Sequence, residues 1–182
     1  VTDSREVALL ATHPWVTEEI EILVLNHGRY DRIQAIELDL EQLRRTMSTN
    51  FEGAFLVWKA IQPTLARDAR ICVIGSQLGT RGSSHGADYS ASKAALATWA
   101  RSLAQAIAPK GQRVNVIAPG FVDTDILAGD SAEKRASREE EVPLKRLGTP
   151  DDIASTVSFL CGEESAYVTG AVIHVNGGLY LP

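Results

Sequence analysis

Tyr89, Lys93 and Ser76 are the residues of this chain whose types and spacing best suit acid–base chemistry. Tyr89 and Lys93 are four positions apart, a spacing that places both on one face of a helix. A free tyrosine, with a pKa of roughly 10, transfers protons poorly near neutral pH, whereas a neighbouring ammonium group favours the phenolate. We therefore expect Lys93 to lower the pKa of Tyr89, and the Ser76 hydroxyl to meet the same small substrate group.

The segments that carry these residues read as a buried strand and a helix. An apolar run over 70–75 ends at Ser76 and predicts a short strand. Asp88 has the residue type of an N-cap and predicts a helix over 89–107. A strand-end hydroxyl and a phenol on a helix face can then converge on one site.

The glycines between these two segments suggest an alternative, a loop that cradles a nucleotide phosphate. Their spacing matches neither Gly-x-Gly-x-x-Gly nor Gly-x4-Gly-Lys-Ser/Thr, and the next helix begins too late for its first amides to meet a phosphate. We therefore interpret the glycine-rich stretch, which contains Gly75, Gly79, Gly82 and Gly86, as a connecting loop.

Strands and helices are predicted to alternate along the whole chain. Such alternation predicts an α/β fold, a doubly wound parallel sheet with helices on both faces, in which ligands bind at the carboxyl ends of strands. Asn26, Ser76 and Pro119 each follow or end a predicted strand. The expected strands are 21–25, one around Ile71, 114–117 and 171–175, and the expected helices are one from Ser4 to Pro14, 39–65 with a bend near 48–50, 89–107 and 149–160.

Five motifs in order resemble those of the short-chain dehydrogenase/reductase family over nearly the whole chain. Residues 25–28 resemble its Asn-Asn-Ala-Gly element, and Asn50 resembles its helix asparagine. Ser76, Tyr89 and Lys93 match its other catalytic positions, 119–124 its nicotinamide-side loop, and 169–178 its closing strand and tail. The resemblance implies a Rossmann-like fold and hydride transfer between NAD or NADP and a carbonyl or secondary alcohol. It implies catalytic roles for Asn50, Ser76, Tyr89 and Lys93, and cofactor binding by Asn26, Gly28, Tyr89, Lys93, Pro119, Gly120, Val122 and Thr124.

The resemblance also implies a role for each catalytic residue. Tyr89 donates a proton to the developing alkoxide, while Ser76 hydrogen-bonds the same oxygen. Lys93 holds the nicotinamide ribose, and an oxidised nicotinamide adds a second positive charge beside Tyr89. Asn50 anchors a water molecule that resupplies the proton through Lys93, whereas the alternative for Asn50 is an ordinary solvent-facing helix residue.

The sequence departs from the family pattern in three places. Leu25 replaces the first asparagine of the glycine element, and His27 replaces its alanine, where we expect it to crowd the adenosine side of the cofactor groove. The sequence also shows no glycine-rich opening turn. The resemblance aligns its first residues with the stretch after the third strand, so we expect two strand–helix units, roughly 60 residues, to be absent from it.

Composition narrows the classes of partner. The net charge is −5 and the basic residues form no cluster, so the sequence does not indicate nucleic-acid binding. No apolar run approaches the ~20 residues that a helix needs to span a bilayer. The four histidines lack ligand spacing, so we expect no metal site. Cys72 and Cys161 read as buried thiols of a reducing, cytoplasmic compartment. Length and composition suit a single domain over 1–182, incomplete at its N-terminus.

The segment 125–147 has two readings. Its small and charged residues suit a solvated surface helix, whereas the resemblance implies a lid that closes over the substrate. In the second reading, Phe121, Ile126 and Leu127 form its apolar inner face.

Two helices with more than one apolar face, 51–65 and 89–107, suggest contacts with further copies of the chain. The resemblance implies a homodimer or homotetramer. A rival interpretation is a non-catalytic relative or a fragment that acts as a binding or oligomerisation module. Without the two missing units, the strand 21–25 would lie at an unpaired sheet edge, which a partner would have to cover. The sequence leaves open the substrate, for which a 3-oxoacyl thioester is the default, and the choice between NAD and NADP.

Overall fold

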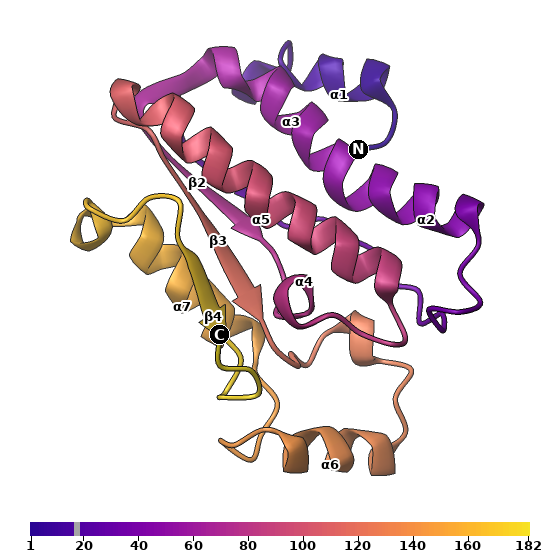
Figure 1. Cartoon of the computed structure of the whole chain (residues 1–182). Helices are drawn as coiled ribbons and strands as arrows, with labels where there is room; N and C mark the ends of the chain where they lie inside the picture. The colour runs from indigo at the N-terminus through magenta and orange to yellow at the C-terminus, as the bar shows by residue number, and fades with distance from the viewer. Residues whose placement is uncertain (17–18) are drawn as a thin grey trace.

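The computed structural model describes residues 1–16 and 19–182, and within them it contains a parallel sheet of four strands in the order β1-β2-β3-β4 (Figure 1). The inner strands are rich in β-branched residues, and β3 is buried along most of its length, as expected for a strand covered on both faces. The strands are β1 (Ile20–Leu25), β2 (Leu65–Ile74), β3 (Arg113–Pro119) and β4 (Val172–Val175).

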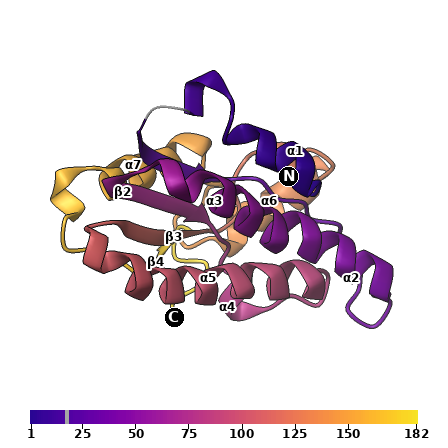
Figure 2. The same cartoon turned by 90° about the horizontal axis from the view of Figure 1, so that it is seen from above.

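Helices cover both faces of this sheet, which confirms the predicted doubly wound architecture (Figure 2). The residues of β2 contact helices on both faces of the sheet in turn, because neighbouring residues of a strand point to opposite faces. Ile71 and Val73 join a core with Leu96 of α5 (Ala87–Ile107), whereas Cys72 packs with Leu160 of α7 (Pro150–Cys161).

Two further helices lie on the α5 side of the sheet, α2 (Leu40–Met47) and α3 (Gly53–Ile61). A capping box begins α2: the Asp39 side chain accepts from the backbone amide of Gln42, and the Gln42 side chain accepts from the backbone amide of Asp39. The predicted bend is a π-helical turn, Ser48–Glu52, between the two helices. This stretch ends at Ile61 rather than at 65, because Pro63 has no N–H to continue the helix and Leu65 already begins β2.

Three other predicted boundaries are wrong or displaced. Asp88 is not the N-cap of α5, which starts at Ala87 after Gly86; the buried Asp88 carboxylate instead accepts a hydrogen bond from the Thr46 hydroxyl. The first helix, α1 (Ser4–Leu10), ends well before Pro14, and β2 begins five residues earlier than the apolar run suggested.

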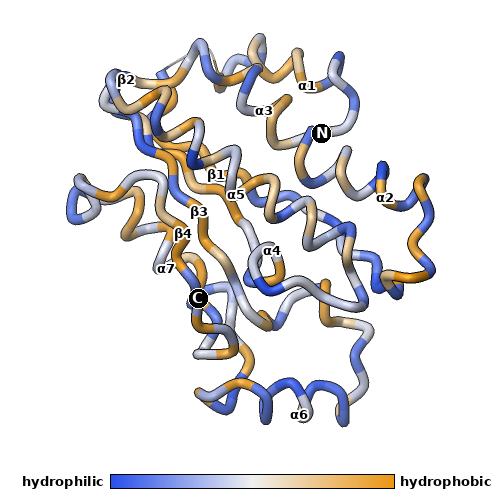
Figure 3. The backbone as a smooth tube through the Cα atoms, in the orientation of Figure 1, coloured by the Kyte–Doolittle hydropathy of each residue, from blue (hydrophilic) through white to orange (hydrophobic). Residues whose placement is uncertain are grey.

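The remaining elements lie around the carboxyl ends of the strands and in the connections. The segment predicted as a surface helix or lid forms α6 (Ala132–Glu141), which is hydrophilic along most of its length (Figure 3). The short helix α4 (Leu78–Arg81) lies in the glycine-rich loop, where sequence reasoning foresaw no element. Single turns are η1 (Pro14–Val16), η3 (Gln62–Thr64), η4 (Ala108–Lys110), η5 (Asp125–Leu127) and η6 (Glu163–Ser165).

Arg113, at the start of β3, ties this strand to the end of α7. Its guanidinium group donates to the carbonyl oxygens of Leu160 and Gly162 at the last turn of α7, where the negative end of the helix dipole favours a cation. Across the described part of the chain, no helix combines the length and hydrophobicity needed to cross a membrane, and no group of three or more potential metal ligands occurs.

Candidate active site

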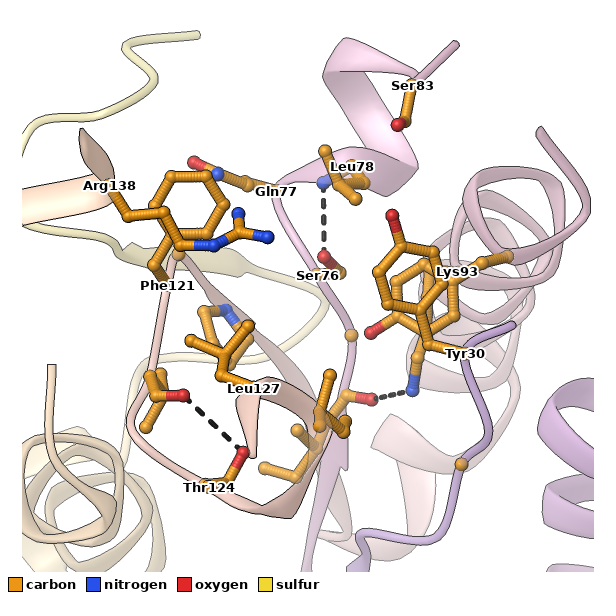
Figure 4. Close-up of a pocket in the computed structure, with 18 of the residues that line it drawn as sticks. Tyr30, Ser76, Gln77, Leu78, Ser83, Lys93, Phe121, Thr124, Leu127 and Arg138 are labelled. Atoms are coloured by element: carbon orange, nitrogen blue, oxygen red, sulfur yellow. Dashed lines mark hydrogen bonds between the residues drawn. The ribbon is translucent and has the colours of Figure 1, made fainter. Parts of the chain in front are cut away.

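A pocket with a volume of about 580 Å³ opens at the carboxyl ends of the strands (Figure 4). Asn26 directly follows β1, Ser76 lies two residues beyond β2, and Pro119 is the last residue of β3; all three line the pocket. The three strand ends therefore lie around one pocket, as expected for the ligand-binding edge of a parallel sheet.

Tyr89 and Lys93 reach this pocket from the first two turns of α5. The Lys93 ammonium nitrogen lies 5.6 Å from the centre of the Tyr89 ring, as the four-residue spacing predicted. The Ser76 side chain lies beside the Tyr89 phenol, where its hydrogen bond acts to lower the pKa of Tyr89. Ser76 also accepts a hydrogen bond of 3.1 Å from the Leu78 amide, which leaves its hydroxyl hydrogen free to donate.

The protonation equilibria of this pair differ from the expectation. Burial raises the pKa of Tyr89, and the opposing effect of Ser76 does not reverse it. Burial also lowers the pKa of Lys93 to about 8. The prediction that Lys93 lowers the pKa of Tyr89 is thus wrong for this structure, because the two groups are so shielded from water that desolvation dominates.

Asn50 is fully buried in the π-helical turn and does not line the pocket. Its amide nitrogen donates to the Arg29 carbonyl oxygen and the Ser92 hydroxyl, and its oxygen accepts from the Arg29 amide at 2.8 Å. The solvent-facing alternative is therefore wrong. The Asn50 side chain instead joins the loop after β1 to α5.

The predicted cofactor-binding residues gather in the same pocket. Gly28, Gly120, Val122 and Thr124 line it together with Asn26, Pro119, Tyr89 and Lys93. A Cβ atom added at Gly28 would lie 3.4 Å from the Lys93 nitrogen, so the glycine lets the chain pass close to the ammonium group. At Gly120 an added Cβ would come within 2.8 Å of the Asn176 backbone, which restricts this loop position to glycine.

The two substituted positions of the glycine element have structural roles outside the pocket. Leu25 is buried in the hydrophobic core. His27 does not line this pocket, and a Cβ atom added at Gly53 would lie 3.1 Å from its ring nitrogen. That His27 crowds the adenosine side of the cofactor groove stays a prediction. Burial lowers the pKa of His27, with the charge of Lys93 acting in the same direction.

Sequence reasoning missed Tyr30, whose ring packs on the Tyr89 ring with 4.6 Å between the centres. The Tyr30 hydroxyl donates to the carbonyl oxygen of His85 at 2.9 Å, which fixes the ring against the loop before α5. The one signal for it was an aromatic residue two positions after Gly28. Tyr30 therefore forms a wall of the pocket directly beside the candidate acid.

Phe121, Ile126 and Leu127 line the pocket from the segment that leads to α6, as the lid reading required. The sequence did not point to the ion pairs behind them. The Asp130 carboxylate accepts from Arg32, in the loop after β1, and from Arg138 on α6. This carboxylate joins the two sides of the pocket mouth.

A family model described as enoyl-(acyl carrier protein) reductase matches residues 1–180. The 3-oxoacyl-[acyl-carrier-protein] reductase FabG of Escherichia coli is 39% identical over 165 residues, which cover 90% of this chain and 68% of that protein. The FabG protein of Vibrio harveyi is 35% identical over 186 residues, covering 100% of this chain and 75% of its own length.

Two solved structures are similar over almost all of this chain. A short-chain dehydrogenase/reductase from Brucella melitensis, described as a glucose/ribitol dehydrogenase, superposes with a TM-score of 0.92 at 33% identity and covers 100% of this chain and 74% of that one. A blue fluorescent protein from a metagenomic library, in complex with NADPH, has a TM-score of 0.90 at 32% identity, with 99% and 73% covered.

Proposed function

The chain belongs to the short-chain dehydrogenase/reductase family of NAD(P)-dependent oxidoreductases, and we propose that it reduces a carbonyl to a secondary alcohol with Tyr89 as the proton donor. The observation that carries this assignment is the meeting of Tyr89, Ser76 and Lys93 at one pocket. Residues 1–182 would act together as one catalytic domain.

The residues around the pocket fit a nicotinamide cofactor. Lys93 offers an ammonium group beside the close approach at Gly28, and Asn26, Gly120 and Thr124 line the neighbouring wall. When bound, the cofactor supplies the hydride to the carbonyl carbon or accepts it from the alcohol. Both NAD and NADP remain candidates.

Tyr89 suits proton donation because a phenol, with an ordinary pKa of roughly 10, is protonated at neutral pH. As the substrate oxygen gains negative charge, the Tyr89 hydroxyl transfers its proton to that oxygen, and Ser76 donates a hydrogen bond to the same atom. The phenolate left on Tyr89 then lies near the Lys93 charge, which is 5.6 Å from the ring centre.

Lys93 and Asn50 would return the proton to Tyr89. Lys93, with its pKa lowered to about 8, exchanges protons more readily near neutral pH than an ordinary lysine. Asn50 and Lys93 both border Gly28. A Cβ atom added at Gly28 would lie 3.4 Å from the Lys93 nitrogen and 3.5 Å from the Asn50 amide oxygen. In this proposal the π-helical turn holds a water molecule beside Lys93, while the Asn50 side chain fixes the position of the turn.

For the substrate, the FabG relatives act on 3-oxoacyl groups, as their names state, and a β-carbonyl compound is therefore the first class to assay. A panel of ketones, 3-oxoacyl thioesters and 3-oxo acids, each with NADH and NADPH, tests the function by the loss of nicotinamide absorbance. Activity that falls at least ~10²-fold in Tyr89→Phe with the fold retained supports the proposal. Equal turnover in the two proteins would remove Tyr89 from the mechanism.

We also propose that the chain assembles as a homodimer or homotetramer through α3 and α5. Four aromatic rings cluster across these helices and the π-helical turn, with Phe55 40% exposed at the surface. The cluster consists of Phe51, Phe55, Trp58 and Trp99.

A cytoplasmic location is supported by Cys72 and Cys161, whose sulfur atoms lie 3.8 Å apart as free thiols.

A further inference from the structure

The charged side chains that line the pocket are mostly cationic, although the whole chain has a net charge of −5. Apart from Lys93, four of them are basic and one, Glu141, is acidic. Positive charge concentrated in the walls of a cleft raises the local concentration of anions. The basic residues are Arg32, Arg81, Lys134 and Arg138.

Arg138 differs from the other three because its side chain is held in place. Its guanidinium carbon lies 4.4 Å from the centre of the Phe121 ring, and its Nε donates to Asp130 at 2.6 Å. Only 12% of the side chain is exposed. In Figure 4 the guanidinium group extends over Phe121 toward the middle of the pocket.

Asp130 leaves an excess of positive charge at this place. Its side chain is 1% exposed and contacts two guanidinium groups, those of Arg32 and Arg138. Arg32 is bound further by donating to the Ile126 carbonyl oxygen at 3.1 Å. One carboxylate shared by two arginines balances only one of the two charges.

The terminal nitrogens of Arg138 make no hydrogen bond to any residue that the structure describes. A guanidinium group that is fixed through Nε and stacked on a ring keeps two parallel N–H donors for a planar oxyanion. This arrangement is prepared for a carboxylate, and its side-chain entropy has already been lost on folding.

We propose that the substrate is a carbonyl or alcohol compound that carries a free carboxylate, and that Arg138 binds this carboxylate. The proposal rests on the proposed oxidoreductase function and narrows its substrate class. Phe121 and Asp130 act as positioning residues, since they hold the guanidinium group without contacting the substrate. A 3-oxo acid would then be preferred to its ester or thioester.

The phosphates of the cofactor are the other anions that could use this positive charge. The test therefore measures substrate selectivity and cofactor affinity separately. Selectivity is the ratio of kcat/KM for acetoacetate to kcat/KM for its ethyl ester, and cofactor affinity is the Kd of NADH and NADPH from fluorescence titration.

Arg138→Gln should raise KM for acetoacetate by about 10- to 100-fold, the loss expected for a hydrogen-bonded charge pair, with little change in kcat. KM for the ethyl ester should rise less than KM for acetoacetate, and the Kd of the cofactor should stay within about threefold. Arg138→Lys keeps a charge but loses the parallel donors, so its KM should lie in between. The matched control is Arg135→Gln on the same helix, because Arg135 pairs with Asp123 and does not line the pocket.

Three results would overturn the inference. One is a wild-type enzyme that reduces the ester or a thioester as well as the acid, which would leave the oxidoreductase function intact. Another is an unchanged acid/ester ratio in both Arg138 variants whose circular dichroism matches that of the wild type. The third is a weaker cofactor affinity with unchanged substrate selectivity, which would assign the charge to a cofactor phosphate. Failure of the function itself would look different, as no carbonyl compound would be reduced.

Discussion

The ammonium nitrogen of Lys93 donates a hydrogen bond to the carbonyl oxygen of Ile74, 2.7 Å away. Ile74 is the last residue of β2, and Ser76 follows two positions later. The bond therefore fixes the helix that carries Tyr89 against the strand that leads to Ser76. It also keeps a cation in a site where only 4% of the lysine is exposed.

The burial of Lys93 predicts a dependence of stability on pH. Its pKa is about 8 in the folded protein and 10.5 in the reference state, so between these values the unfolded chain binds more protons and stability rises with pH. The free energy of unfolding of the wild type, relative to Lys93→Met, should increase by up to about 3 kcal/mol as the pH rises through this window.

Urea unfolding of both proteins at several pH values between 7 and 10.5 measures this difference, and other titrating groups cancel in the comparison. A constant difference over the whole range would mean that Lys93 is not desolvated as the structure indicates.

Asn50 predicts a second effect on stability. Replacing it by alanine removes the partners of the Arg29 amide and carbonyl groups and of the Ser92 hydroxyl. Because these groups are buried or half-buried, Asn50→Ala should lower the free energy of unfolding by roughly 2–4 kcal/mol. Thr49→Ala, in the same turn, removes one exposed hydroxyl bond to Arg45 and should cost less than about 1 kcal/mol. Similar losses in the two variants, measured by urea unfolding, would contradict the joining role of Asn50.

The predictions from sequence succeeded where short-range geometry decides. The four-residue spacing placed Tyr89 and Lys93 on one helix face, and the predicted helix starts at 39 and 149 coincide with the N-caps of α2 and α7, Asp39 and Thr149. They failed where a distant partner decides. Asp88 looks like an N-cap, but Thr46, far away in sequence, takes its carboxylate.

The pKa of Tyr89 was missed for a related reason. Its neighbour in sequence, Lys93, suggested a lower value, whereas the surrounding fold buries the phenol and raises the value. Arg32, Asp130 and Arg138 come from segments that no local pattern connects, so their cluster becomes visible only when the chain is folded. Local motifs thus point to the candidate acid Tyr89, and the tertiary structure defines the charge and the walls of the pocket around it.

The aromatic cluster on α3 and α5 predicts the effect of a surface charge on self-association. If copies of the chain pack through this face, Phe55→Glu buries an unpaired carboxylate in the contact and should shift the mass in solution toward the monomer. Phe159→Glu is the matched control, because Phe159 is exposed to a similar degree on α7, at the opposite face of the sheet. Light scattering that gives one mass for wild type and Phe55→Glu would place the contact elsewhere.

Asp130 predicts how firmly α6 is held over the pocket. Burial opposes ionisation of its carboxyl, but the hydrogen bonds from Arg138 and Arg32 outweigh this effect and hold its pKa below the usual 3.8. The stabilisation is therefore complete above the pKa of the unfolded carboxyl and is lost as the pH falls through the lower value of the folded state. Asp130→Asn removes the charge at nearly constant shape and leaves two arginines without their shared partner.

We expect amide hydrogen exchange across 125–141 to become faster in Asp130→Asn at neutral pH, while the strands keep their protection. The difference in thermal stability between this variant and the wild type should shrink as the pH falls from about 4 through the lowered pKa of the folded Asp130, where the wild-type carboxylate also takes up a proton. Asp125→Asn provides the control, because Asp125 is exposed and no described residue pairs with its side chain. Unchanged exchange over 125–141 in Asp130→Asn would show that this segment is held by apolar contacts, such as those of Ile126 and Leu127, without help from the ion pairs.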